Sequence, residues 1–421
     1  MMCVADQPAS IESDTRSGAA EPARITSPRG AGDQLLYFTS SSLTEDDRTV
    51  VFIREIDGNP NLWACDIATG EARQLTDNAS GYLKSYVYFD GRPNEGFGKA
   101  SVSLHPASGR AYFIQGPELR CVEPDGSMRT LATLRDGEVT AFTHVSARGR
   151  FICIPTTDGR ALDGAFKDNR PQYDIDRRVR EEGLRSYLNL YDTITGRLLH
   201  REVIKGAWVT HVQFSPRNPS LILYNHEWPS DCGVRRVWLW DGKSHRALRP
   251  EGDERSRGDW VCHEMWSRDG KSVIYHGRYA GTDPVTDGGR LVFGAGNGPA
   301  FIGRCHAYGA DIAEIPLPAH YTRYGHFTAG NGDWLVTDGY HEQPDDPPGH
   351  GAWISLLKPD WDEKTIDWRP LCHHGSSWKS QDEHPHPIYD HAGGSVLFTS
   401  DVGGTRAVYR VPSGLAGENE V

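Results

Sequence analysis

The sequence has no apolar run that approaches the roughly 20 residues a helix needs to cross a bilayer, so no membrane partner is expected. It also lacks paired cysteines: eight cysteines stand singly along 421 residues, without a CxxC motif. Scattered cysteines predict reduced thiols in a cytoplasmic protein rather than a disulfide framework.

Basic residues are fewer than acidic residues. The chain has 45 basic and 57 acidic residues, a net charge of -12. That balance argues against nucleic acid and anionic membranes as partners, but it permits a small anionic ligand where positive charge is concentrated locally. There is no GxSxG motif for a serine hydrolase, and the glycine run at 294–298 lacks the strand and helix that would make it a phosphate loop.

The first 30 residues contain no basic segment followed by an apolar one, so no secretory signal is predicted. We expect residues 1–30 to be a flexible polar arm and residues 31–415 to form one catalytic domain. A length of 421 residues fits one large all-β domain, or two to three average ones.

Short segments rich in β-branched and aromatic residues dominate the chain, among them "TVVFIRE", "GRAYFIQG", "LILYNHE" and "SVLFTSD". Strand, turn and strand recur with "D-x-x-T-G" or "D-G" between them, at a period of about 40–60 residues that is typical of propeller blades. The pattern predicts an all-β fold, a seven-bladed β-propeller, and its regularity disfavours an array of sandwiches. The predicted blades begin near residues 35, 98, 138, 208, 260, 322 and 381.

Three segments depart from the repeat. The last predicted blade is short of an outer strand, which "ARIT" at 23–26 is able to supply by closing the ring. Residues 174–188 have near-helical spacing of apolar residues and are expected to form an inserted helix. The segment at 281–300 is expected to be a long loop of the fifth blade.

Histidines recur at the start of four consecutive predicted blades. The first strand of each blade lines the channel of a propeller, so these imidazoles are expected to surround one half of the axis. A single histidine is more often a satisfied polar group than a ligand, but five in equivalent positions favour a functional site. They are His211, His263, His326, His384 and His386.

The stretch "SQDEHPHP" predicts a metal site. His384 and His386 are two residues apart, which on a strand points both side chains to one face. Gln381 and, from the preceding blade, His326 complete a set of three imidazoles and one amide. Neutral ligands leave the full charge of a cation available to polarise a substrate oxygen. These ligand types permit zinc, manganese, iron or nickel; a plain polar turn is the alternative for Gln381.

A second group of polar residues flanks the hairpin "YNHEWPSDCGVRRVWLWDG". Arg236 beside the axis offers a planar fork for a carboxylate, whereas the alternative is a surface arginine paired with Glu227 or Asp231. In the next blade, Glu264 is a candidate for orienting His263 and raising its basicity. A regular strand points Glu264 to the opposite face, so this role needs an irregular strand.

These motifs resemble the oligogalacturonate lyases, seven-bladed propeller enzymes that use a divalent metal, usually Mn²⁺. The resemblance covers nearly the whole globular part and is carried by "HEWP…RRVW", "HEMWSRDG", "H-x11-DG" and "Q-x-x-H-P-H-P". It implies four metal ligands, namely His326, Gln381, His384 and His386, and a catalytic pair that falls on Arg236 and His263.

The implied activity is that of a carbon–oxygen lyase of pectin degradation. It cleaves short uronide oligosaccharides by β-elimination and leaves 4,5-unsaturated products. His263 is expected to be the base and Arg236 to hold the substrate carboxylate; the reverse assignment needs a deprotonated arginine, which is costly. The residues expected to contact the small anionic oligosaccharide are His211, His226, Glu227 and Trp228, with Trp378 as a further wall of the cleft.

Two departures from the family pattern bear on the sugar. Trp228 stands where the family has glycine in "HEGP", and Ala329 with Gly330 replaces the usual Ser-Asn. A different uronide on the same scaffold is therefore an alternative substrate. A non-catalytic propeller that serves as a scaffold is the alternative of another class, and a uronide hydrolase or epimerase is a third.

Overall fold

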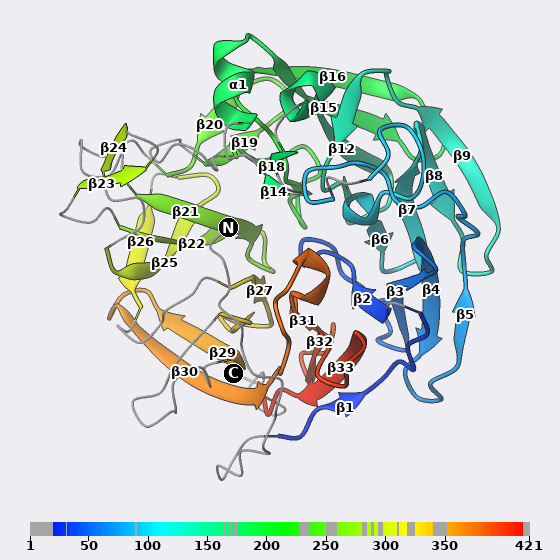
Figure 1. The fold of residues 1–421 in the computed structure, drawn as a ribbon. Helices are drawn as coiled ribbons and strands as arrows, with labels where there is room; N and C mark the ends of the chain where they lie inside the picture. The colour runs from blue at the N-terminus through cyan, green and yellow to red at the C-terminus, as the bar shows by residue number, and fades with distance from the viewer. Residues whose placement is uncertain are drawn as a thin grey trace.

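A computed structural model describes residues 20–30, 32–88, 91–163, 166–167, 170–171, 175–227, 236–249, 259–279, 284–287, 290–293, 298–309, 311–317, 325–339 and 352–415. Within these ranges, six four-stranded sheets and one five-stranded sheet lie in a ring around a central axis (Figure 1). The fold is the seven-bladed β-propeller that the sequence predicts.

The first four blades follow one another along the chain. The first contains β2 (Gly32–Leu35), β3 (Thr49–Ile56), β4 (Asn59–Asp66) and β5 (Ala72–Gln74). The second contains β6 (Ser103–His105), β7 (Arg110–Gln115), β8 (Glu118–Val122) and β9 (Met128–Thr133). The third contains β10 (Glu138–Thr140), β11 (His144–Val145), β12 (Phe151–Asp158), β15 (Arg185–Asp192) and β16 (Leu198–Lys205). The fourth contains β17 (Val212–Phe214), β18 (Ile222–Asn225), β19 (Val237–Trp240) and β20 (His245–Ala247).

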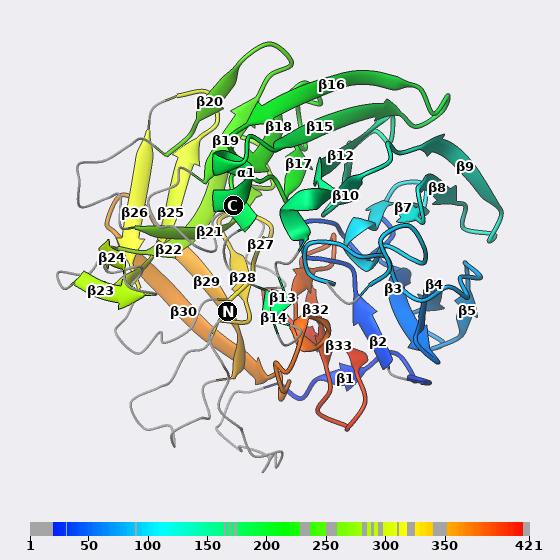
Figure 2. The ribbon, with the colours of Figure 1, turned by 45° about the horizontal axis from the view of Figure 1, so that its top comes forward.

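Three more blades complete the ring. The fifth contains β21 (Trp260–Trp266), β22 (Ser272–Arg278), β25 (Ala300–His306) and β26 (Ile312–Pro316). The sixth contains β27 (Phe327–Ala329), β28 (Leu335–Thr337), β29 (Trp353–Asp360) and β30 (Thr365–His373). The seventh contains β31 (Ile388–Tyr389), β32 (Ser395–Ser400), β33 (Ala407–Pro412) and β1 (Ala23–Arg24). Every pairing within the blades is antiparallel, and the tilted view shows the outer strands around the rim (Figure 2).

The apolar core lies between neighbouring blades. Val51 and Leu62 of the first blade, for example, share one buried cluster with Leu104 and Phe113 of the second. Because the middle strands are covered on both faces, they read as continuous apolar runs rather than as alternating patterns. β7 shows this, since the four residues between Arg110 and Gln115 are all buried.

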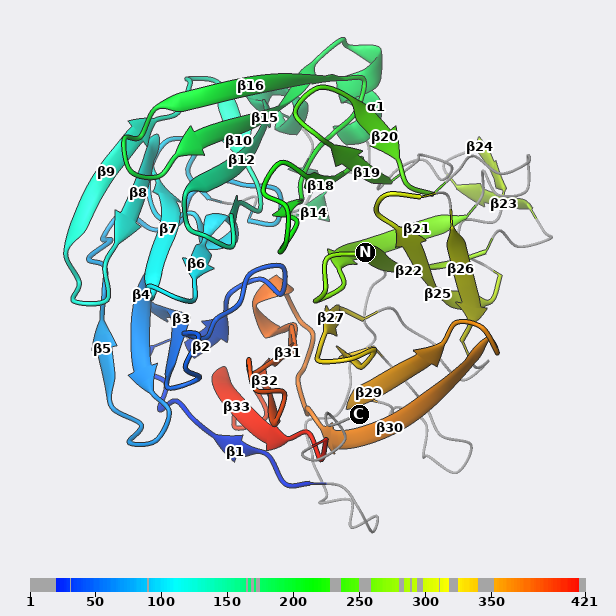
Figure 3. The same ribbon diagram turned by 180° about the vertical axis from the view of Figure 1, so that it is seen from behind.

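The two ends of the described chain meet in the seventh blade. β1 pairs with β33 through Ala23 opposite Arg410, and the Ile25 amide donates to the Val408 carbonyl at 2.8 Å. The outer strand of the last blade therefore comes from the beginning of the chain, as the sequence predicts for residues 23–26 (Figure 3). Residues 1–19 of the expected arm lie outside the described residues, and the domain limits 31–415 stay a prediction.

Short elements interrupt the blades. Two hairpins are inserted, β13 (Phe166–Lys167) with β14 (Arg170–Pro171), and β23 (Pro284–Asp287) with β24 (Arg290–Phe293). The segment expected to be a long loop at 281–300 thus contains a hairpin. The helical elements are α1 (Ile175–Glu181), η1 (Lys99–Ser101), η2 (Gly159–Leu162) and η4 (Gln381–Glu383).

The helix expected over 174–188 is wrong at its C-terminal end. α1 stops at Glu181, and Gly183 follows with a φ of 66°, the left-handed conformation that commonly ends a helix. From Arg185 the chain enters β15, whose residues pair with β12 and β16. Pairing on both sides overrides the local helical spacing.

Across the described part of the chain, no helix combines the length and the apolar character that crossing a membrane requires. The cysteines described there are free thiols, namely Cys65, Cys121, Cys153, Cys262, Cys305 and Cys372.

Candidate metal centre and active site

The five histidines predicted to surround the axis lie at the inner strands of the fourth to seventh blades. His211 immediately precedes β17, His263 lies within β21, and His326 immediately precedes β27. His384 and His386 lie between η4 and β31. The inner strands that carry them face the centre of the ring (Figure 1).

Three imidazoles form a compact group that we call the three-histidine group: His326, His384 and His386. Their ligand atoms all lie within 4.8 Å of one another. The 3₁₀ turn η4 brings Gln381 to the same place, with its side-chain nitrogen 3.2 Å from His386 Nε2. Rotation of that amide presents its carbonyl oxygen there instead. The structure therefore brings together all four residues predicted as metal ligands.

Asp338 joins the two segments that carry these ligands. Its carboxylate accepts a hydrogen bond from His326 Nδ1 at 2.9 Å and from the backbone amides of His326 and His386 at 2.6 and 3.1 Å. Because Nδ1 of His326 is the donor in this pair, its Nε2 carries the lone pair. A carboxylate behind a histidine is the common means of orienting a metal-binding imidazole. The sequence analysis assigned Asp338 no role, although it lies in the quoted "H-x11-DG" motif.

Burial keeps the group neutral. Desolvation lowers the pKa of His326 and His386 well below the usual range and that of His384 to about 4. Nδ1 of His384 is buried and makes no hydrogen bond with any residue in the described ranges. Neutral imidazoles with unshared lone pairs are the form that binds a transition metal.

Three residues at this site have a strained backbone conformation. His263, His386 and Trp378 have φ values of 47°, 45° and 54°, a region that side-chain-bearing residues rarely occupy. Such strain is characteristic of functional sites, where surrounding contacts hold it in place. The Trp378 ring lies beside the metal ligands, with its centroid 4.4 Å from that of His384.

Arg236 is held in a buried ionic cluster with two carboxylates. Its Nη1 donates to Glu227 at 2.6 Å and its Nε to Glu264 at 2.7 Å, while its Nη2 lies 3.1 Å from His211 Nδ1. The arginine is 3% exposed, so the alternative of a surface arginine is wrong, although the pairing with Glu227 is present. Burial opposes the charge, but the Glu227 and Glu264 carboxylates raise the pKa of Arg236 far above its usual value. This cluster disfavours Arg236 as a base.

An irregularity in β21 sets the direction of His263 and Glu264. The register of β21 against β22 shifts between Cys262 and Met265, and His263 takes its positive φ there. A bulge of this kind re-aims side chains. As a result, Glu264 reaches Arg236 and His211. The strand has the irregularity that the sequence analysis named as the condition for Glu264 to reach the site.

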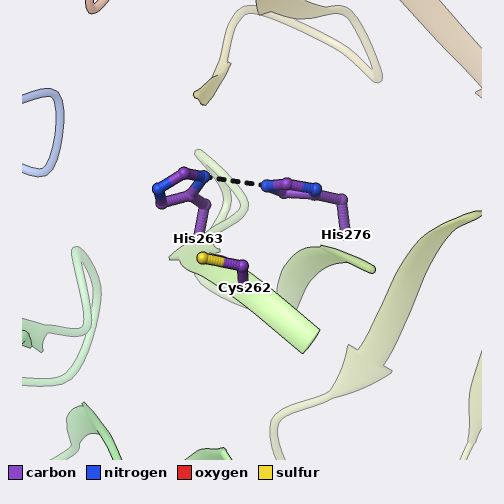
Figure 4. Close-up of side chains that lie close together, drawn as sticks. All are labelled: Cys262, His263 and His276. Atoms are coloured by element: carbon purple, nitrogen blue, oxygen red, sulfur yellow. Dashed lines mark hydrogen bonds between the residues drawn. The ribbon is translucent and has the colours of Figure 1, made fainter. Parts of the chain in front are cut away.

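His263 is fixed by two polar contacts. Its Nδ1 lies 2.8 Å from the Gly325 carbonyl oxygen and 2.8 Å from His276 Nε2 (Figure 4). A carbonyl only accepts, so Nδ1 carries the proton and Nε2 the lone pair. Burial, followed by the positive charge of Arg236, lowers the pKa of His263 to about 4. Its ring centroid is 4.4 Å from that of His326, which places a neutral imidazole beside the three-histidine group.

Tyr37, which follows β2, connects the arginine cluster with the metal ligands. Its hydroxyl is 3.1 Å from His211 Nε2, and its ring centroid is 5.0 Å from that of His386. Phe142 stacks on the Tyr37 ring, with the two centroids 3.7 Å apart. Tyr37, Phe142, His276 and Phe38, whose ring centroid is 5.2 Å from that of His326, were not predicted from the sequence. The available signal was the position of "LLYFTS" at the start of the first blade.

The predicted substrate contacts have different surroundings. His211 belongs to the arginine cluster, and Glu227 also accepts from Thr210 and Asn225. His226 stacks on Trp238 with centroids 4.5 Å apart, within its own blade. Trp228 lies outside the described residues. The substrate contacts of all four stay predictions.

No protein-family model matches this chain. It is 27% identical over 231 residues to an oligogalacturonide lyase of Pectobacterium atrosepticum, a match that covers 50% of this chain and 52% of the relative. It is 25% identical over 230 residues to an oligogalacturonate lyase of Dickeya dadantii, with the same coverage of 50% and 52%. The match thus spans about half the length of these curated relatives.

Two solved structures resemble nearly the whole chain. An oligogalacturonate lyase from Vibrio parahaemolyticus has a TM-score of 0.69 at 20% identity, covering 96% of this chain and 95% of that one. An oligogalacturonate lyase in complex with manganese has a TM-score of 0.68 at 21% identity, covering 94% of each chain. The resemblance stated from the sequence motifs is confirmed, and these structures show the propeller fold.

Proposed function

We propose that this protein is a metal-dependent lyase that shortens uronide oligosaccharides by β-elimination, with oligogalacturonides as the first candidates and manganese as the metal. The observation that carries the proposal is the three-histidine group with Gln381 at its edge and a neutral His263 beside it. The names of the matched relatives support the same reaction.

The donor set suits a divalent transition metal. His326, His384 and His386 supply neutral nitrogens, Gln381 supplies an amide oxygen, and Asp338 orients His326 from behind. When bound, a divalent cation polarises a substrate oxygen and lowers the free energy of the charge that develops beside the uronate carboxylate.

In this proposal, His263 is the base. Its Nδ1 is engaged with the Gly325 carbonyl, so Nε2 is the atom that accepts the C5 proton of the uronate. A pKa of about 4 keeps this imidazole neutral at pH 7 and ready to accept. As the proton leaves, the bond from C4 to its oxygen breaks and a C4=C5 double bond forms.

Arg236 is proposed to stabilise the substrate carboxylate. Three of its five N–H groups are directed at Glu227, Glu264 and His211. At most two therefore remain for a ligand, on Nη1 and Nη2. The cluster fixes the guanidinium before substrate arrives, which reduces the cost of ordering it on binding.

The test is an assay of the purified full chain, stripped with a chelator and reloaded with manganese. Di- and trigalacturonate should produce an ultraviolet absorbance from the C4=C5 double bond only in the reloaded sample. The panel then extends to other uronides, because Trp228 and the pair Ala329–Gly330 depart from the lyase pattern. A signal with another uronide alone would reassign the sugar. New reducing ends without absorbance would indicate a hydrolase, and neither product with any uronide would contradict enzymatic activity.

A further inference from the structure

A second group of metal-binding side chains lies directly beside the first. Cys262 and His276 are opposite each other in the pairing of β21 with β22. In a regular strand His263 would point to the other face from Cys262. The bulge and the positive φ of His263 instead place its ring on the same side as the thiol and opposite the His276 ring (Figure 4).

The geometry is close to that of a three-ligand site. Cys262 Sγ and one nitrogen each of His263 and His276 all lie within 4.8 Å of one another. The two nitrogens are 2.8 Å apart, whereas Zn–N bonds of about 2.0–2.1 Å at tetrahedral angles put ligand nitrogens about 3.3 Å apart. The rings need to separate by roughly half an ångström, within the range of small χ adjustments.

The ligand chemistry differs from that of the three-histidine group. One sulfur and two imidazoles favour a thiophilic cation such as Zn²⁺ or Cd²⁺, whereas imidazoles with an amide oxygen suit Mn²⁺. Cys262 and His263 are half-buried rather than fully enclosed. Burial raises the pKa of the free thiol to about 12, and a coordinated cation reverses that protonation.

We infer that Cys262, His263 and His276 form a second metal site, which binds Zn²⁺ or Cd²⁺ and inhibits the enzyme by engaging His263. The inhibitory part rests on the proposed function; the binding part does not. Zinc on His263 Nδ1 displaces the hydrogen bond to Gly325. The neutral imidazole then carries its one proton on Nε2. The proposed reaction needs that atom unprotonated, because its lone pair accepts the C5 proton. Overall, binding releases one proton to solvent, from the Cys262 thiol.

The binding test uses absorbance, not activity. The full chain carries Cys3→Ser and Cys232→Ser, because these two cysteines lie outside the described residues. With manganese present, added Cd²⁺ should produce a thiolate-to-cadmium charge-transfer band. Cys262→Ser should abolish the band, whereas Cys372→Ser, a buried cysteine of the sixth blade, should keep it. Circular dichroism checks that each variant is folded.

A cadmium NMR spectrum of the unsubstituted protein gives a reading that needs no variant at the site. A resonance from a sulfur-containing site, separate from a nitrogen-and-oxygen site, supports the inference. No band and no such resonance at cadmium concentrations that fill the three-histidine group would overturn it, as would a band that survives Cys262→Ser.

The inhibition test measures the Zn²⁺ concentration that halves activity, each variant being compared with its own manganese-loaded rate. Since even outer-sphere partners are worth roughly 10- to 100-fold in metal affinity, Cys262→Ser should raise this concentration by about tenfold or more. An unchanged concentration would overturn the inhibitory role. If the protein has no lyase activity, the cadmium band still decides whether the site exists, so the two failures are distinguishable.

Discussion

His263 is held on one side by the Gly325 carbonyl and faces His326 on the other, so a small change to its ring tests its role directly. His263→Gln keeps a polar side chain but removes the basic nitrogen. We expect turnover to fall by roughly 10²- to 10⁴-fold, the usual contribution of a general base, with manganese still bound.

The control for this variant is His105→Gln, which replaces a half-buried histidine at the end of β6 that is hydrogen-bonded to Ser108 and Ala147. It should leave the rate within about twofold of the unsubstituted protein. Turnover by His263→Gln at the unsubstituted rate would require a different base.

Asp338 is expected to act on metal binding, because it is hydrogen-bonded to the segments that carry His326 and His386. Asp338→Asn leaves an acceptor oxygen but removes the negative charge behind His326. We expect manganese affinity to fall by roughly 10- to 100-fold, while turnover at saturating manganese changes far less. Calorimetric titration with Mn²⁺ measures the first quantity. An equal loss of turnover at saturating metal would show that Asp338 contacts the reaction itself.

The turn η4, which carries Gln381, is clamped by a buried ionic network. Lys99 Nζ lies 2.6 Å from Asp382 and 3.1 Å from Glu55, and Arg406 Nη1 lies 2.8 Å from Asp382. Lys99 is 4% exposed, and its ammonium also lies over the rings of Tyr82 and Tyr88, 5.0 and 4.5 Å from their centroids. The network comes from the first, second and seventh blades, and it fixes the position of a metal ligand that sits on a short turn.

Lys99→Met should loosen that turn. Removing one member of a buried ion pair costs up to about 3–5 kcal/mol when the remaining charge is left unpaired. Asp382 keeps Arg406 at 2.8 Å, so we expect the loss to stay below that limit. We expect a lower free energy of unfolding and weaker manganese binding, measured by urea denaturation and by titration. Lys271→Met is the matched control, since its pairing with Asp269 is solvent-exposed and worth under about 1 kcal/mol. If Lys99→Met lowers the free energy of unfolding but leaves manganese affinity unchanged, the ionic network contributes to stability and not to metal binding.

The blades could be predicted from the sequence because each repeats the same strand and turn signals. The proximity of the three histidines could be predicted because they recur at equivalent blade starts. The bulge at His263 could not, since alternation along a strand places His263 and Glu264 on opposite faces. Asp338 lies in a Thr-Asp-Gly stretch that is common in turns, and its role depends on contacts with a different blade. The end of α1 was decided by pairing with strands distant in sequence.

At the scale of the whole molecule, buried histidines predict a loss of stability in acid. Burial lowers the pKa of His144 and His374 to about 4 and that of His226 to about 3. Nδ1 of His144 and of His374 accepts a backbone N–H bond, which protonation would break.

The unfolded chain, with ordinary histidine pKa values near 6.5, binds more protons than the folded one between pH 6.5 and pH 4. The free energy of unfolding should therefore fall as the pH falls through that window, by about 1.4 kcal/mol per pH unit for each proton taken up. Denaturation series across this window measure the slope. His144→Asn keeps an acceptor and should reduce the uptake by about one proton; an identical slope would contradict the assignment.

Closure of the ring by β1 predicts a further effect on the whole molecule. Deleting residues 1–25 removes the pairing of β1 with β33 and the hydrogen bond from Ile25 to Val408. Each such bond is worth about 1 kcal/mol, so the unfolding temperature should fall clearly. Deleting residues 1–19 alone leaves β1 in place and is the control. Equal unfolding temperatures for the two deletions would show that the pairing contributes nothing to stability.

The pairing of β1 with β33 also bears on the order in which the nascent chain is able to fold. β1 is made before the strands of the first six blades, whereas its partner β33 is made after them. Gln381, His384 and His386, the proposed metal ligands, are translated shortly before β33. The proposed ligands and the strand that pairs with β1 to close the ring are therefore made close together in time. A ribosome-bound nascent chain that ends before residue 381 contains the strands of the first six blades, but its β1 does not yet have β33 to pair with. Under the proposed function, a nascent chain is expected to acquire manganese only after residues 381–386 have been made.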